Sequence, residues 1–223
     1  MAKLIDIFHQ VNMSQGILET LYMVFCSTVL SYLIGLPLGI FSVITDEGGL
    51  MPKKNINKGL GVIINLGRSV PFIILMIALT PLTRLIIGKS WGSTAAIVPL
   101  TIAAIPFVSR LIESTLKEVD DKLIESAICM GASPLQIILK VYLVESIPSI
   151  IRGLSITTIT LIGYSAMAGA VGGGGLGNIA ITYGYYRFDS KIMIITLVIL
   201  VLMVEIIQVI FENVTKKIDK SKR

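Results

Sequence analysis

Charged side chains are scarce in this chain of 223 residues. Asp, Glu, Lys and Arg make up 15% of it, whereas hydrophobic residues make up 54%. Soluble domains carry roughly 25% charged residues. A hydrocarbon core of about 30 Å needs about 20 apolar residues for each helix that crosses it. The low charge content therefore argues against an ordinary soluble domain and favours a protein embedded in a bilayer.

Histidine and cysteine are rarer still. His9 is the single histidine, and Cys26 and Cys129 are the two cysteines. With so few ligands at such spacing, the sequence predicts no metal site. Cys26 lies within the first apolar segment and Cys129 in a polar stretch outside the spans, too far apart for a disulfide, so we expect both to be free thiols. No base stands beside a serine to activate it as a nucleophile. An intramembrane enzyme is therefore the least favoured class.

A nucleotide-binding loop is also missing. The stretch "GGGGLG" (172–177) fits G-x-G-x-x-G, but no strand precedes it, and glycines there favour close helix packing instead. The stretch "GKS" (88–90) resembles the end of a Walker A loop, yet Thr83 occupies the position of its first glycine. If transport is driven by ATP, the nucleotide and its Mg²⁺ must be held by another chain. We therefore predict that this chain itself binds no cofactor.

Five apolar segments are long enough to cross a bilayer. Pro99, Pro106 and Arg110 make the third segment the weakest of them. The segments are Ile17 to Ile44, Leu60 to Ile87, Thr94 to Phe107 with an extension to Leu116, Ile150 to Val171, and Ile192 to Phe211. We predict an all-α membrane protein with five transmembrane helices.

The first sixteen residues do not read as a cleavable signal, because Asp6, His9 and Gln10 interrupt the apolar run. Leu4, Ile5, Phe8 and Val11 share a helical face, which suits a helix along the membrane surface.

Lys and Arg side chains set the predicted orientation, because they concentrate on the cytoplasmic side. With the N-terminus outside and the C-terminus cytoplasmic, thirteen fall inside and five outside, and Arg68 lies within a span. The inner set is Lys53, Lys54, Lys58, Arg110, Lys117, Lys122, Lys140, Arg152, Lys216, Lys217, Lys220, Lys222 and Arg223; the outer set is Lys3, Arg84, Lys89, Arg187 and Lys191. The net charge of +5 thus indicates an anionic lipid surface and no nucleic-acid partner.

A polar stretch separates the third and fourth segments. Asp120 or Asp121 is placed to cap a short helix that stops at Gly131, a favoured residue after a helix end. Ser133, Pro134 and Gln136 then form a capping box that restarts a helix, which we expect to run to Pro148. A first helix of about ten residues spans only about 15 Å and cannot cross a bilayer. A solvated connector is the simplest interpretation of such a hairpin.

The residues of the hairpin also suggest a function for it. Glu125, Ser126 and Ala127, followed by Gly131 and an apolar helix, resemble the EAA loop of ABC importer permeases. The family usually has alanine in place of Ser126, and a Leu-Pro late in the loop where this chain has "ESIPSI" with Pro148. In that family a short coupling helix docks in a cleft of a separate ATPase. The resemblance implies that Leu123, Glu125, Ser126, Ala127 and Gly131 couple this chain to an ATPase.

Two further stretches, "GRSVPFIILMIALTPLTR" (67–84) and "TLIGYSAMAGAVGGGGLGNIAITYGYYRFD" (160–189), look like the permease subunit of methionine importers. The resemblance covers nearly the whole chain. It implies the type I ABC importer permease fold, with 1–223 as one transmembrane domain and 117–149 as the cytoplasmic coupling loop. It also implies two ATPase subunits, an extracytoplasmic substrate-binding protein, and methionine or related amino acids as the substrate, all at a bacterial inner membrane. Since no internal repeat is visible, a two-fold pathway requires a second copy of the chain, and we expect a homodimer.

Polar residues inside spans are costly and therefore informative. Hydrogen bonding between helices explains them as well as a pathway does, and packing alone accounts for a methionine. The family resemblance favours a pathway or gate formed by Arg68, Ser69, Tyr164, Ser165 and Met167.

Arg68 and Glu205 lie about 12 Å and about 16 Å from the inner ends of their spans, counted at 1.5 Å per residue. We expect them to pair within or between subunits or to face one watery cavity; a Glu205 that faces water alone is the competing interpretation.

Two other classes remain for comparison. A secondary transporter would show inverted repeats and carboxylates near the midplane, where Glu205 is the single candidate. A membrane scaffold would show no polar residues along a solute path. Both are less favoured than an ABC importer permease.

Overall fold

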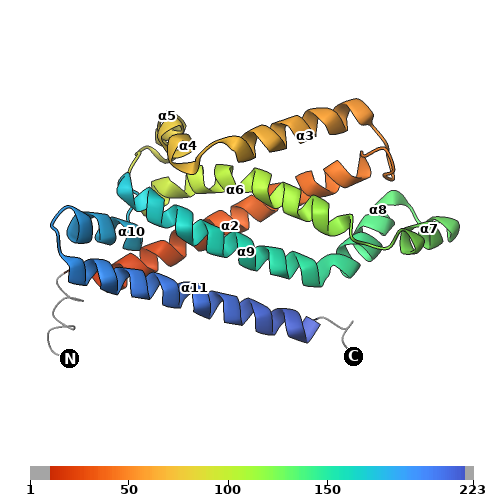
Figure 1. Ribbon diagram of the computed structural model, residues 1–223. Helices are drawn as coiled ribbons and strands as arrows, with labels where there is room; N and C mark the ends of the chain where they lie inside the picture. The colour runs from red at the N-terminus through yellow and green to blue at the C-terminus, as the bar shows by residue number, and fades with distance from the viewer. Residues whose placement is uncertain (1–10, 219–223) are drawn as a thin grey trace.

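The structure of the chain is a computed structural model that describes residues 11–218, and within this range all regular structure is helical (Figure 1). In chain order the elements are α2 (Met13–Ile44), α3 (Lys54–Ser69), α4 (Phe72–Ala78), α5 (Thr80–Ile87), α6 (Ser93–Leu116), α7 (Asp121–Cys129), α8 (Pro134–Ile137), η1 (Ile138–Tyr142), α9 (Leu143–Ala170), α10 (Gly175–Ile179), η2 (Ala180–Tyr185) and α11 (Ser190–Ile218). Expectations for the N-terminal surface helix fall mainly on residues 1–10, outside the described residues.

Contacts at the two ends of the molecule show how often the chain crosses it. At one end, Met13 of α2 packs with Leu176 of α10 and Ile192 of α11. At the other end, Val43 of α2 packs with Leu116 of α6 and Ala127 of α7. The backbone N–H of Gly92, just before α6, donates to the carbonyl of Gly172 at 2.8 Å, so α6 starts at the α10 end. The segment between α2 and α6 must therefore cross too, which makes five crossings.

The second crossing is broken, whereas the sequence predicted one helix from Leu60 to Ile87. Helices α3 and α4 meet at an angle of 100°. The cause is Pro71: proline disfavours the helical conformation in the residue before it, and Val70 is extended with φ −82° and ψ 124°. Four helical segments are long and apolar enough to span a bilayer by themselves, and the bent pair α3–α4 supplies the fifth span.

Helix α6 is the central helix of the fold, although its sequence was the weakest candidate. It runs unbroken from Ser93 to Leu116 through Pro99 and Pro106. It contacts α2, α3, α4, α5 and α9, so it is largely surrounded by protein (Figure 1). The ring of Pro106 lies against Gly67 of α3, where a Cβ would come within 2.6 Å of the ring. The prolines that weakened the prediction thus serve as packing surfaces.

Small residues bring α2 and α6 close together. Ser27, Ser31, Gly35 and Gly39 recur every four residues along α2, and all four are buried. A Cβ on Gly39 would come within 2.7 Å of the carbonyl oxygen of Ser109 in α6. In a bilayer, such stripes let helix backbones approach closely enough for dispersion contacts to hold them together.

The helix after Ser133 does not stop at Pro148 as the sequence predicted. It passes from α8 through the π-helical turns of η1 into α9, and Pro148 lies inside α9. The N–H of Leu143 donates to the carbonyl of Ile138, five residues back. One continuous helical path therefore runs from Pro134, beside the α7 hairpin, to Ala170 at the far end of the molecule.

The glycine-rich stretch folds back against the end of α9. Gly174 and Gly175 have φ values of +79° and +72°, a region that residues with a side chain rarely adopt. The Glu19 carboxylate accepts the N–H of Gly175 at 2.7 Å, and the Thr20 hydroxyl accepts the N–H of Leu176 at 2.9 Å. These bonds from α2 satisfy the start of α10. The prediction of close helix packing at this stretch is confirmed.

Packing of α10 on α9 gives the first testable prediction. A Cβ on Gly169 would overlap the backbone of Gly177 and Asn178. We expect Gly169→Ala to destabilise the fold by about 1–3 kcal/mol, the usual cost of overpacking, measured as a lower melting temperature of the purified protein. Gly59→Ala in α3 is the control, because a Cβ there meets nothing within 4 Å and gains the same helix propensity. Equal melting temperatures for the two variants would contradict this account of the contact.

Candidate functional site

The hairpin α7–α8 has the local structure that its sequence predicts. The Asp120 carboxylate accepts the N–H of Lys122 at 3.0 Å and caps α7. Gly131 has φ +80° and reverses the chain after α7. Ser133 and Gln136 form the reciprocal capping box that starts α8. Each of these features rests on neighbours in the sequence, which is why the sequence alone was sufficient to place them.

An apolar surface at the tip of the hairpin is uncovered. Ala127 is buried and Ile124 half-buried against the end of the helical bundle. Leu123, Ile128 and Met130 are 45%, 52% and 80% exposed. Glu125 and Ser126 are exposed too, and the Ser126 hydroxyl donates to the carbonyl of Lys122 at 2.7 Å. The tip therefore presents both apolar side chains and a carboxylate to its surroundings, as a docking surface does.

An ion-pair network fixes the base of the hairpin. The Lys117 ammonium lies 2.6 Å from the Asp46 carboxylate and 3.1 Å from the Glu113 carboxylate. The Arg110 guanidinium lies 2.8 Å from the same Glu113 carboxylate. The hydrogen bond from Lys117 lowers the pKa of Asp46, and the bond to Asp46 raises the pKa of Lys117. Because Asp46 follows α2 and Lys117 follows α6, the network joins the ends of these two helices that lie beside the hairpin.

Helix α9 carries an exposed stripe along one face. Arg152, Ile156, Gly163, Met167 and Ala170 follow one another at intervals of three, four or seven residues and are all exposed. Helix α4 packs against α9 on one side, and α11 packs against it on another (Figure 1). The stripe between them is an open face of α9.

The structure separates the residues that the sequence grouped in the fourth span. Met167 is 48% exposed and lies on the α9 stripe. Tyr164 is half-buried and stacks on Phe72 of α4, with ring centroids 4.5 Å apart. Ser165 is buried, and its hydroxyl donates to the carbonyl of Ile162 at 2.8 Å. Met167 therefore faces outward, while Tyr164 packs on α4 and Ser165 faces the interior of the subunit.

Arg68 and Ser69 occupy the last turn of α3, directly before the break, and both are exposed. The Ser69 hydroxyl donates to the carbonyl of Asn65 at 2.8 Å. Helices α3 and α11 lie on opposite sides of α9 and α6 (Figure 1). Among the ion pairs of residues 11–218, none joins Arg68 to Glu205. Pairing of the two within one subunit is wrong, because other helices stand between them; pairing between subunits stays a prediction.

Helix α11 carries a polar stripe that the sequence analysis did not identify. Glu205, Gln208, Glu212 and Lys216 recur at intervals of three or four residues on the otherwise apolar α11. Three of them, with Arg152 and Ser155 of α9, line an open groove of about 640 Å³ between the two helices. The spacing of these polar residues at helical intervals within an apolar span could have revealed the stripe from the sequence.

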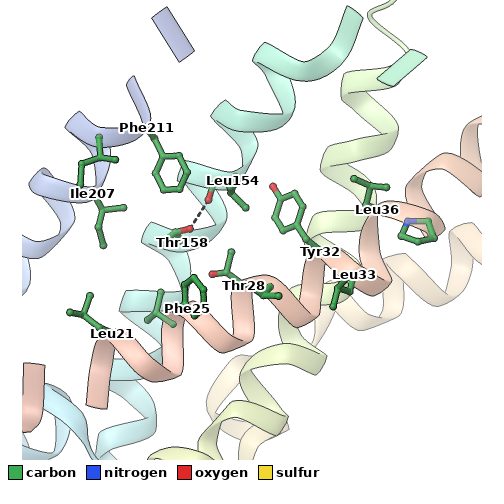
Figure 2. Close-up of a pocket in the computed structure, with 14 residues that line it drawn as sticks. Leu21, Phe25, Thr28, Tyr32, Leu33, Leu36, Leu154, Thr158, Ile207 and Phe211 are labelled. Atoms are coloured by element: carbon green, nitrogen blue, oxygen red, sulfur yellow. Dashed lines mark hydrogen bonds between the residues drawn. The ribbon is translucent and has the colours of Figure 1, made fainter. Parts of the chain in front are cut away.

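The other side of α9 and α11 is different in character. There a groove of about 740 Å³ opens between α2, α9 and α11, and nearly all of its lining is apolar (Figure 2). Leu21, Phe25 and Leu33 of α2 face Leu154, Ile207 and Phe211 across it (Figure 2). Thr158 contributes a hydroxyl, which is bonded to the carbonyl of Leu154 at 2.7 Å. Such a surface suits contact with lipid, so the polar and apolar sides of the subunit are clearly distinguished.

These features define a class of protein. Five crossings, a groove lined by charged residues of α9 and α11, and an uncovered hairpin at one end are typical of a membrane permease subunit. Among residues 11–218 no three His, Cys, Asp or Glu side chains are placed to hold a metal ion.

Comparison with known proteins identifies the family. The family model described as "Binding-protein-dependent transport system inner membrane component" matches residues 35–220. The chain belongs to this family and is an ABC importer permease.

Individual relatives agree with this assignment. The probable D-methionine transport system permease protein MetI of Vibrio cholerae is 52% identical over 201 residues, which cover 90% of this chain and 89% of that protein. The D-methionine transport system permease protein MetI of Escherichia coli K12 is 44% identical over 155 residues, which cover 70% and 71%.

Solved structures show the same fold. The MetNI methionine ABC transporter in an inward-facing conformation has a chain that matches with a TM-score of 0.93 and 41% identity, covering 96% of this chain and 98% of that one. An amino acid ABC transporter matches with a TM-score of 0.78 at 18% identity, covering 96% and 97%, which supports the fold alone.

Proposed function

We propose that this chain is the permease subunit of an importer for methionine or closely related amino acids. The observation that carries the proposal is the 52% identity, over 90% of the chain, to a probable D-methionine permease. The structural match to a methionine transporter at a TM-score of 0.93 supports it. Inverted repeats, which a secondary transporter would show, are not visible in the sequence, so that alternative is less favoured.

The importer works as an assembly in this proposal. One subunit has a single α9 face, which is open on the side away from α6 (Figure 1). A second copy related by a two-fold axis closes it and forms a central pathway. A substrate-binding protein delivers the amino acid at the α10 end of the pathway, which is extracytoplasmic. The sidedness follows from the excess of Lys and Arg at the α7 end.

Two ATPase subunits bind the α7 hairpins on the cytoplasmic side. Leu123, Ile128 and Met130 supply apolar contact, and Glu125 supplies a charge at the rim of that contact. ATP and Mg²⁺ belong to those subunits, and this chain transmits the movement. Met167 and the neighbouring Gly163 on α9, with Arg68 and Ser69 at the break in the second span, line the pathway, and Ser165 and Tyr164 hold Met167 in place.

Uptake tests the proposed function directly. Deletion of the gene in the source bacterium is expected to abolish high-affinity uptake of radiolabelled methionine, and the wild-type chain is expected to restore it. Competition with unlabelled D-methionine, L-methionine and leucine defines the range of substrates. Unchanged methionine uptake in the deletion strain, with no other methionine importer present, would refute the proposal.

Gly131 provides a sharper prediction about coupling. Its φ of +80° costs a residue with a Cβ about 1–2 kcal/mol, and nothing else stands within 4 Å of that Cβ. We expect Gly131→Val to leave the amount of permease in the membrane unchanged, and to lower uptake and substrate-stimulated ATPase activity of the complex together. Gly131→Asn is the matched control, since asparagine tolerates this conformation better, and it should retain most of the uptake. Normal uptake by the Gly131→Val variant would contradict the proposed coupling role of this turn.

A further inference from the structure

The apolar groove of Figure 2 lies between two helices that hardly touch each other. Helix α11 packs on α9, η2 and α10, and it has little contact with α2. At the α10 end, Met13 of α2 and Ile192 of α11 belong to one apolar cluster. Further along, Leu33 of α2 and Phe211 of α11 line a groove of about 740 Å³ (Figure 2). Because water does not readily fill an apolar space, this groove needs an apolar occupant.

The second copy of the chain is not that occupant in the proposed assembly. The copy closes the open face of α9, on which Ile156 and Met167 lie exposed. The groove is lined by Leu154 and Thr158 of the same helix. Each of these is two residues from Ile156, and at 3.6 residues per turn they lie on the opposite side of α9. The groove therefore faces away from the pathway, towards the surrounding bilayer.

The face of α11 that lines the groove ends in a lysine. Ile207 and Ile210 belong to the lining, and Lys217 lies seven residues after Ile210, on the same face of the helix. It stands about 10 Å from Ile210 in the direction of the cytoplasm. Lys217 is exposed, and it takes part in none of the ion pairs among residues 11–218. A cation in this place attracts the phosphate of an anionic lipid in the inner leaflet.

We propose that the groove binds an acyl chain of an anionic phospholipid from the cytoplasmic leaflet, and that Lys217 pairs with the phosphate of that lipid. The acyl chain contacts Leu33, Ile207 and Ile210 and fills the space between α2 and α11. The bound lipid thus completes the packing of α11 on the side that no helix covers. This inference takes the arrangement of two copies from the proposed function and adds a ligand that lies outside the pathway.

Quenching of a tryptophan by brominated lipid tests the site in the full-length chain. Trp91→Phe removes the single native tryptophan. Leu33→Trp then reports on the α2 wall of the groove, and Ile210→Trp reports independently on the α11 wall. The chain is reconstituted in phosphatidylcholine vesicles with rising fractions of brominated phosphatidylglycerol or brominated phosphatidylcholine. Half-maximal quenching should need about fivefold less phosphatidylglycerol, the preference that one lysine near the membrane surface gives. Lys217→Gln should remove this preference.

The matched control is Ile63→Trp in α3. Ile63 is 68% exposed and Leu33 66%, but Ile63 lies outside the groove. Both lie roughly 15 Å from the inner ends of their helices. The two lipids should quench Ile63→Trp alike.

Three results would each overturn the lipid site. They are equal quenching by the two lipids at both groove positions, the same preference for phosphatidylglycerol at Ile63→Trp, and no quenching in the groove because protein covers it. Methionine uptake by the assembled complex is measured separately. A failed lipid site with intact uptake therefore leaves the proposed import function standing.

Discussion

The close contact between α2 and α6 is the interaction on which the rest of this structure depends. Within a bilayer the hydrophobic effect does not drive helices together, because lipid tails are as apolar as leucine side chains. Association must come from tight packing, and the stripe of Ser27, Ser31, Gly35 and Gly39 allows it. Because α6 in turn contacts α3, α4, α5 and α9, the positions of these four helices follow from this one contact, and α11 packs on α9 in its turn.

The same arrangement joins the hairpin to the exposed stripe of α9. At the hairpin end of the molecule, the network of Asp46, Lys117 and Glu113 ties α2 to α6. From the hairpin, α8, η1 and α9 form a continuous helical path to the stripe that carries Met167. Only the short turn at Gly131 separates α7 from the start of this path. Beyond the far end of that path, Glu19 and Thr20 of α2 bond to the start of α10, which packs on α9.

Features with local causes were predictable from the sequence. Asp120, Gly131, Ser133 and Gln136 cap or end helices through bonds to near neighbours, so the hairpin was predicted residue by residue. The number of spans also followed, since length and hydropathy fix it. Features with tertiary causes were not predictable. Pro148 remains inside α9, whereas Pro71 breaks the second span, and sequence spacing does not distinguish such cases.

The candidate site shows the same difference between features with local causes and features with tertiary causes. Met167 and Ser165 are two residues apart, yet one is exposed and the other buried, because the packing of α2, α4, α6, α10 and α11 decides which face of α9 is covered. The polar stripe of α11 was visible in the spacing of Gln208 and Glu212. The groove that it lines also includes Arg152 of α9, which lies sixty residues before Glu212 in the sequence.

The central claim is that the α9 faces of two copies form one pathway that the ATPase opens and closes. Labelling of Met167→Cys in the assembled complex, with the native cysteines replaced, tests it most directly. The account predicts that the rate of reaction with a water-soluble maleimide changes between the nucleotide-free and the ATP-bound complex, because Met167 faces the pathway. A rate that is the same in both states, in a complex that still imports methionine, would contradict it.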